Sequence, residues 1–531
     1  MAQTVLSVVI EAQPQSADVL RGLISDLRDK QAALEPAYAD LRTVETLHFL
    51  SMNVFADDQY DPIYVLEANF DGQPGPFWAG LEAAIGPQLR DMLRCCKRPR
   101  GRLGAMFDAV TVAGASAPIA PLLQAQTVKP AVHHQGNRGL SRQRIEQEAQ
   151  LFIDLRAVLT DPTRFQGQSP TQAHQALRAQ MLPSHPWLTP PAPPRIGVVE
   201  NLADWARLIG FVLAVVVILH LPGMLMSWIL PPWPALIVLA LLAAIFGGVL
   251  KVIAANDDPP VDPPPKGPQP KTSPPWGPIL LGLLAVLVFE HLLAWVVARI
   301  GVWTGGSGHI HGGLVIAGLG LAGVVPTVLG IGAWLRGVEQ RDASQDAPPV
   351  DAQKLRDIMA LEDKVAQNHM GSVVHIKPGV LRTILVRAAL MGLGLILRIQ
   401  ARSGYLGSMR TIHFAHWALV SNGGRLMFFS NFDGSWESYL DDFIEKAHAG
   451  LTLAWTSGVG FPPTRFLVQG GATQGRKFKA WARHSMAPSL FWFSGYRVLS
   501  VNQIERQTRI ADGLRKPTLT PEEAARWTMD L

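Results

Sequence analysis

The chain has 531 residues, enough for two or three domains of about 100–200 residues each. Apolar residues make up 48% of it and charged residues only 17%, against about 25% in typical soluble domains. This composition excludes a disordered chain and argues against an entirely soluble one. The net charge of +5 is too small to indicate a nucleic-acid partner. The adjacent Cys95 and Cys96 exclude a disulfide scaffold and a four-cysteine zinc site, and no other metal site is predicted.

The first 160 residues alternate between strand and helix patterns. Residues 4–12 (TVLSVVIEA) predict a strand and Ser16–Leu34 an amphipathic helix. Two more strands are expected at 46–56 and 62–70, before a helix over Phe77–Leu93. The order β-α-β-β-α is typical of a ferredoxin-like unit, which we place at residues 1–160 with a last helix near Ser141–Leu159. Residues 161–203, within a region rich in Ala, Gln and Pro, are predicted to be a linker.

Four uncharged or nearly uncharged stretches follow within residues 204–336. They are Ile209–Leu230, Trp233–Leu250, Pro278–Val297 and Gly312–Leu335. Each is close to the roughly 20 residues that cross a bilayer core, where the backbone must be helical. The lipid bilayer is therefore the first predicted partner.

The connections between these stretches predict their orientation. The segment 254–275 is rich in proline, which makes it an extended spacer. Lys and Arg gather in or beside this segment and at the two outer flanks: Arg195, Arg207, Lys251, Lys266, Lys271, Arg336 and Arg341. Because Lys and Arg accumulate on the cytoplasmic side, we expect a multi-pass protein of the cell (inner) membrane with both termini in the cytoplasm.

After a linker and helix at 337–370, residues 371–531 predict a second unit with the same element order. The expected elements are a strand at 372–378 (SVVHIKP), a helix over Val380–Ile399, strands at 411–420 and 425–432, a helix over Trp436–Ala449 and a strand at 464–470 (TRFLVQG). Ser421-Asn422-Gly423-Gly424 is a hairpin signal. The arginines of Val380–Ile399 interrupt its apolar run, which favours a core or interfacial helix over a fifth span.

Three matches relate the two units. Thr46-Leu47-His48-Phe49 recurs as Thr411-Ile412-His413-Phe414, and Asn69-Phe70-Asp71-Gly72 as Asn431-Phe432-Asp433-Gly434. The segment from Leu140 recurs from Leu499. All three matches have the same order and nearly the same spacing, about 360 residues, which indicates a duplicated module. The predicted fold is α+β plus transmembrane helices: a duplicated ferredoxin-like module, forming a dimeric α+β barrel, with a four-helix transmembrane insertion.

The strand pair IHFAHWALV and LMFFSNFDGSWESYLDDF resembles a family of bacterial membrane proteins described as peroxidase-like or peroxidase-associated. More distantly, the duplicated barrel is similar to dye-decolourising peroxidases, which bind haem between sheet and helices. Their G-x-x-D-G motif is matched at its end by Asp433-Gly434, with Ser430 in the place of the first glycine. The resemblance implies haem as a cofactor, Asp433 beside it and His484 as its axial ligand.

Four histidines and one aspartate are therefore candidate site residues. Asp433, His413 and His484 are candidate catalytic residues, and His413 and His484 are also haem candidates. His220 and His291 lie about 22–24 Å along the first and third spans, so they are level and could together hold a haem. Structural roles compete with each of these: a turn aspartate, a hydrogen-bonded core histidine, and polar packing between helices.

Two functions are compatible with these patterns. The first is a non-catalytic, membrane-tethered binding or scaffold module that holds a protein partner, such as a peroxidase, at the membrane. The alternative is a haem-dependent, peroxidase-like oxidoreductase. No Walker loop, dinucleotide fingerprint, serine-hydrolase elbow or H-E-x-x-H motif is present, which weighs against the common enzymes that carry them.

Overall fold

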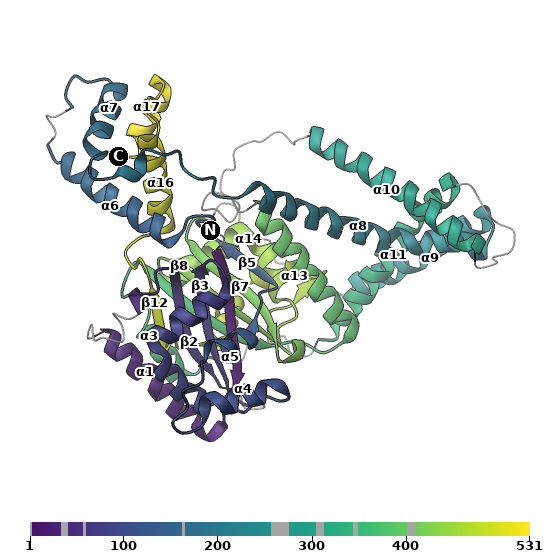
Figure 1. The fold of residues 1–531 in the computed structure, drawn as a ribbon. Coiled ribbons are helices and arrows are strands. Elements are labelled where there is room, and N and C mark those ends of the chain that lie inside the picture. The colour runs from purple at the N-terminus through teal and green to yellow at the C-terminus, as the bar shows by residue number, and fades with distance from the viewer. Residues whose placement is uncertain are drawn as a thin grey trace.

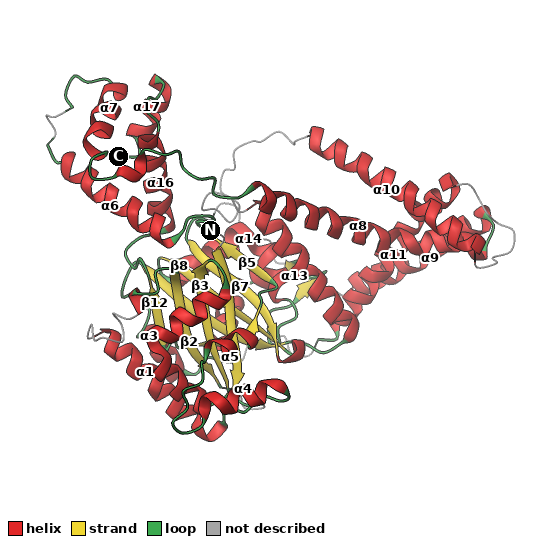
Figure 2. Ribbon diagram, in the orientation of Figure 1, coloured by secondary structure: helices red, strands yellow, loops and turns green. Residues whose placement is uncertain are grey.

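The computed structural model describes residues 3–32, 41–56, 60–161, 165–255, 257, 276–303, 313–342, 349–400 and 409–531. Two five-stranded antiparallel sheets lie together in one soluble domain, and long apolar helices project from its side (Figures 1 and 2). The protein is therefore a mixed helix and sheet structure. Most of the predicted loop 254–275 lies outside the described residues.

The first sheet has the strand order β12-β2-β3-β1-β4. Its strands are β1 (Gln3–Glu11), β2 (Leu47–Phe55), β3 (Ile63–Asp71), β4 (Thr127–Val128) and β12 (Phe491–Ser494). One face is covered by α1 (Ala17–Ala32), α3 (Pro74–Arg94), α4 (Arg102–Thr111) and α5 (Ala120–Ala125). The strands predicted at 4–12, 46–56 and 62–70 are confirmed to within a residue, because their apolar residues pack on these helices.

The second sheet has the order β11-β6-β8-β7-β5. Its strands are β5 (Val132–Gln135), β6 (Gln367–His375), β7 (Ile412–Val420), β8 (Arg425–Asp433) and β11 (Met486–Ala487). Its outer face is covered by α13 (Val380–Gln400), α14 (Trp436–Trp455) and α15 (Gly475–Ser485). Short 3₁₀ helices lie at Pro14–Ser16, Pro186–Leu188, Ser421–Gly423 and Gly471–Thr473, the third of these in the predicted hairpin turn.

Two strand predictions of the second half are corrected. The strand expected at 372–378 begins five residues earlier, because β6 pairs with β8 along its whole length. The strand expected at 464–470 is wrong: β9 (Thr464–Arg465) and β10 (Gln469–Gly470) form a separate two-residue hairpin. Phe466 and Leu467, between them, both have positive φ, which breaks an extended strand. The sheet edge beside β6 is formed by β11 instead.

Each half of the chain contributes one strand to the sheet of the other half. β5, which precedes the apolar helices in sequence, pairs with β7, and β12 pairs with β2. Immediately after each exchanged strand, a glycine N–H donates to the backbone oxygen of a histidine on the strand that it pairs with. Gly136 donates to His413 O at 2.8 Å, and Gly495 donates to His48 O at 2.8 Å. Neither sheet is complete without the other half of the chain.

The two sheets pack face to face, so their inner faces form a shared interior. Its apolar part contains residues of both sheets: Phe55, Ile63, Val65, Ala418, Val420, Met427, Phe429 and Ala487. Beside the sheets, α6 (Arg142–Val158) and α7 (Pro170–Met181) pack on α16 (Val501–Arg515) and α17 (Pro521–Thr528) around a separate small core (Figure 1). The segment 161–203 is thus not only a linker, because α7 buries Leu177 and Met181 in that core.

Four helices of the described residues are long and apolar enough to cross a membrane: α8 (Val198–Ile229), α9 (Pro232–Ala255), α11 (Gly313–Gln340) and α13. The first three contain predicted spans. The remaining predicted span, Pro278–Val297, falls in α10 (Trp276–Trp303), part of whose side chains lie outside the described residues.

α8 and α11 meet at Gly223 and Gly323, where a β-carbon on Gly223 would lie 2.1 Å from Leu319 O. Small residues permit such close approach between membrane helices. The linker at 337–370 contains α12 (Ala352–Met359).

The strand exchange predicts that Gly136→Ala destabilises the soluble domain. A β-carbon at Gly136 would lie 2.0 Å from the backbone oxygen of Ile412, so β5 must shift away from β7. We expect a loss of about 1–3 kcal/mol, measured as a lower thermal unfolding midpoint in detergent. Gly22→Ala is the control, because its β-carbon meets nothing within 4 Å on helix α1. An unchanged midpoint for Gly136→Ala would mean that β5 is not held tightly.

Candidate functional site

A buried carboxylate lies at the centre of the interior between the two sheets. Glu67, on β3, is fully buried. Its Oε2 accepts hydrogen bonds from Ser51 Oγ at 2.8 Å and lies 3.1 Å from His369 Nε2, while Oε1 accepts from Asn69 and Asn431 at 2.7 and 3.1 Å. These partners come from both sheets, so Glu67 connects the sheets through direct polar contacts.

The groups around Glu67 form a second ring of hydrogen bonds. His369 Nδ1 lies 2.6 Å from Ser489 Oγ, and Trp492 Nε1 donates to Asn431 Oδ1 at 2.8 Å. His416 Nε2 lies 3.0 Å from Ser7 Oγ. Most of these polar groups are therefore paired within the interior, but Asn69 Oδ1 and His416 Nδ1 are buried without a hydrogen-bond partner among the described residues.

The surroundings of Glu67 and His416 shift their pKa values, so the two side chains differ in charge state at neutral pH. Burial alone raises the pKa of Glu67, but the hydrogen bond and charge of His369, with the charge of His416, outweigh burial and lower this pKa to about 2. Burial lowers the pKa of His416 to about 4, although Glu67 acts in the opposite direction. At neutral pH the cluster therefore contains an ionised Glu67 and a neutral His416.

The predicted candidates His413 and Asp433 are in direct contact. His413 Nε2 lies 2.8 Å from Asp433 Oδ1, and Asp433 Oδ2 accepts a hydrogen bond from Val501 N–H, the first residue of α16, at 2.8 Å. Asp433 thereby satisfies a free donor at a helix N-terminus, where a negative charge is favourable. This arrangement is a structural reason for an aspartate at the end of β8.

The first half contains the same arrangement. His48 Nε2 lies 3.1 Å from Asp71 Oδ1, and Asp71 Oδ2 accepts from Arg142 N–H, the first residue of α6, at 2.7 Å. His48 Nδ1 also contacts Tyr496 OH at 2.9 Å. An open pocket of about 500 Å³ lies beside Asp71 and Gly72, lined also by Thr4, Thr46, Gln73, Pro76 and Phe77.

The residues of the second half do not fit a haem between the sheet and its helices. The space there, beside Phe428, Tyr439 and Trp481, is only about 20 Å³, because aromatic side chains fill it. His413 is held by Asp433 and packs against the rings of Phe49 and Tyr496. His484, at the end of α15, is exposed at the surface.

The two candidate histidines of the long apolar helices have different surroundings. His220 Nδ1, on α8, lies 2.8 Å from Glu290 Oε1 on α10, and both side chains are buried. His291 is exposed, with its ring next to Gly313 on α11. The buried polar pair is thus His220 with Glu290, and His291 is not part of it.

Two ion-pair clusters join the apolar helices to the soluble domain. At the start of α8, Asp204 binds Arg398 of α13 and Arg138 of the segment after β5, at 2.8 and 2.7 Å. Glu200 contacts the same two arginines. Asp204 and Arg138 are buried, which strengthens their attraction relative to a surface pair. The first residues of α8 are therefore fixed to the second sheet and its helix.

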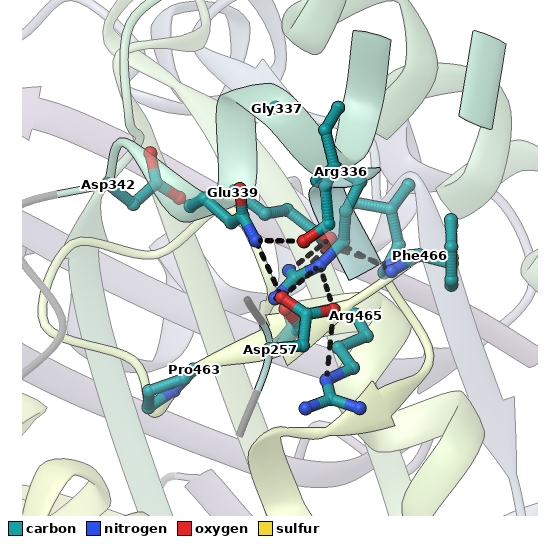
Figure 3. A network of polar contacts seen from close by, with 12 residues as sticks. Asp257, Arg336, Gly337, Glu339, Asp342, Pro463, Arg465 and Phe466 are labelled. Atoms are coloured by element: carbon teal, nitrogen blue, oxygen red, sulfur yellow. Dashed lines mark hydrogen bonds and ion pairs between the residues drawn. The ribbon is translucent and has the colours of Figure 1, made fainter. Parts of the chain in front are cut away.

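The second cluster lies at the end of α11 (Figure 3). Arg336 donates to Asp257, after α9, at 2.6 Å and to Thr464 O at 2.9 Å. Glu339 accepts the N–H groups of Phe466 and Leu467 at 2.9 and 3.0 Å. Their left-handed backbone costs roughly 1–2 kcal/mol per residue, which these charge-assisted hydrogen bonds offset.

Comparisons with protein-family models, with curated proteins and with solved structures find no match to this chain. Among the described residues, no group of three or more His, Cys, Asp or Glu could hold a metal ion. The site is therefore interpreted from its geometry alone.

Sequence reasoning singled out His413 and Asp433 but missed Glu67, His369 and His416. One signal was present: Glu67 is the only charged residue inside the apolar segment IYVLEANF. A charge in the middle of a strand buried on both faces needs partners, but the sequence does not show which residues of the other half supply them.

The buried histidines predict that stability falls on acidification. Burial lowers the pKa of His134 and of His416 from 6.5 to about 4, so the unfolded chain binds protons that the folded chain does not. Each histidine contributes up to about 3 kcal/mol, present above pH 6.5 and lost as the pH falls towards 4. Unfolding midpoints between pH 7.5 and 4.5 measure this loss. His416→Gln should flatten the dependence, and a wild-type midpoint that does not change over this range would contradict the prediction.

Proposed function

We propose that this protein is an integral membrane protein whose soluble part is a non-catalytic binding or scaffold module. The observation that carries the proposal is that the interior of the soluble domain is filled. The polar groups between the sheets bind one another, and about 20 Å³ remains between the second sheet and its helices. A catalytic site for a large cofactor needs an open cavity at these places.

We propose further that each half is a ferredoxin-like module and that the two arose by duplication. In each sheet the strands of one half follow the order fourth, first, third, second, which this fold has. Equivalent residues also make equivalent contacts, as Gln3 Nε2 donates to Leu140 O and Gln367 Nε2 to Leu499 O. The exchanged strands then join the modules into one α+β barrel, in keeping with the resemblance to peroxidase-like families.

The proposed topology follows from the sheets. β5 and β7 belong to one sheet with β6, so the chain between β5 and β6 must cross the membrane an even number of times. α8, α9, α10 and α11 supply four crossings. Because Lys and Arg flank the ends of these helices next to the soluble domain, we place that domain and both termini in the cytoplasm. The partner, which the resemblance implies to be a peroxidase, would bind there.

Absorbance spectroscopy tests the non-catalytic assignment. Protein purified after expression with added haem precursor should show no Soret band at a stoichiometric level. The space between the second sheet and its helices is only about 20 Å³, and the open pocket of about 500 Å³ beside Asp71 has no histidine among its lining residues. A Soret band that disappears in His413→Ala or His484→Ala would instead favour the peroxidase-like oxidoreductase. A band lost in His220→Ala or His291→Ala would indicate a membrane cytochrome.

Reporter fusions test the topology. A periplasmic alkaline phosphatase placed after Leu531 should be inactive, and the same reporter placed after Leu230 should be active, since the first turn of the bundle lies outside in this arrangement. A fluorescent protein that folds only in the cytoplasm is the complementary control at both sites. Phosphatase activity after Leu531 would overturn the orientation.

A further inference from the structure

Helix α13 satisfies the length and hydropathy of a membrane span, but its place in the fold is incompatible with a crossing. It connects β6 to β7, which both belong to the second sheet. A single crossing between them would place two strands of one sheet on opposite sides of a bilayer. On its inner face, Val386 and Leu390 are buried in the core of the second sheet, and a β-carbon on Gly394 would meet Ala131 O at 3.0 Å.

Both ends of α13 form ion pairs with the apolar helices: one end with the residues after α11, the other with the first turns of α8. At its start, Arg382 makes two 2.8 Å hydrogen bonds to Asp342, two residues beyond the end of α11. At its end, Arg398 donates to Asp204 in the first turns of α8. With 21 residues at about 1.5 Å each, α13 extends from the end of α11 to the start of α8, as Figure 1 shows. Its axis therefore runs along the surface from which α8 and α11 project.

The outer face of α13 is apolar and uncovered. The exposed residues recur with helical spacing: Val380, Leu381, Ile384, Arg387, Ala388, Met391 and Ile396. Ile384 and Met391 are each 56% exposed, and Arg387 is the one charged member of this set. An amphipathic helix with a large apolar face and basic residues is suited to the boundary of headgroups and acyl chains.

The apolar face continues into the apolar helices themselves. The ring of Phe211, on α8, packs against Gly392, where a β-carbon would be only 3.0 Å away. Large exposed apolar residues of α8, such as Ile209 and Val212, lie next to this contact in sequence. The surface of α13 is thus continuous with surface that lipid covers if α8 crosses the membrane.

We propose that α13 is an in-plane helix of the cytoplasmic leaflet, with its Ile384–Met391 face immersed among the acyl chains between α8 and α11. The lipid bilayer is then in contact with the soluble domain itself and holds it at a fixed depth. This inference rests on the proposed membrane insertion of α8, α9, α10 and α11. Exposure of several large apolar side chains on one helix face is otherwise unfavourable in water.

Depth-resolved quenching in lipid nanodiscs tests this inference. Single cysteines replace Leu381, Ile384, Ala388 or Met391 and are labelled with an environment-sensitive fluorophore, and lipids brominated at different acyl positions are the quenchers. The unmodified chain is the labelling blank, because Cys95 and Cys96 are buried. Labels at Leu381 and Met391, about 15 Å apart along the helix, should be quenched most by the same shallow bromine position.

Two controls separate the inference from the proposed function. Leu241→Cys on α9, 57% exposed, should be quenched by the deepest bromines, and Val19→Cys on α1, 59% exposed, should not be quenched. Depths that change steadily from Leu381 to Met391 would mean that α13 crosses the bilayer. Iodide quenching of the α13 labels without bromine quenching would place this face in water. If Leu241 also escapes bromine quenching, the membrane proposal itself fails.

Discussion

The exchange of strands between the two halves of the chain is the constraint on which the rest of the structure depends. β5 completes the sheet of the second half, and β12 extends the sheet of the first. The apolar helices are inserted between the partners of the first exchange. Both sheets must therefore form on one side of any membrane that these helices cross. Formation of the soluble domain requires contacts between residues more than 250 positions apart, as between Val132 and Trp417.

Buried charge gives this assembly its specific geometry. Moving an ionised group out of water costs several kcal/mol, so each buried charge must have well-placed partners. The partners of Glu67 are in place only when both sheets are in register. The partners of Asp204 and Arg336 are in place only when α8 and α11 are packed against the soluble domain. Apolar packing alone would tolerate small shifts between these parts. The ion pairs and hydrogen bonds depend on exact donor and acceptor positions in both parts, so small shifts would break them.

The same contacts explain why resemblance and geometry lead to different functional expectations. The Asp-Gly turn that resembles part of a haem-binding motif has structural contacts in both halves: Asp71 and Asp433 each lie next to a histidine and accept a hydrogen bond from the first N–H of a helix. In Asp433, one carboxylate oxygen contacts His413 and the other accepts the first N–H of α16, which gives this aspartate a role in the fold without a substrate. Recurrence of the arrangement in both halves also fits a role in the fold.

The sequence by itself determined the local structure of this protein. Alternating and helical apolar patterns located most strands and helices, and the paired motifs at His48 and His413 indicated two related halves. Only the tertiary structure decided which segments meet: the edge strand β11 in place of residues 464–470, the folding of α7 within an expected linker, and the partners of Glu67. Local patterns depend on neighbours a few residues apart. Strand exchange and buried ion pairs depend on residues hundreds of positions apart, whose pairing no local pattern encodes.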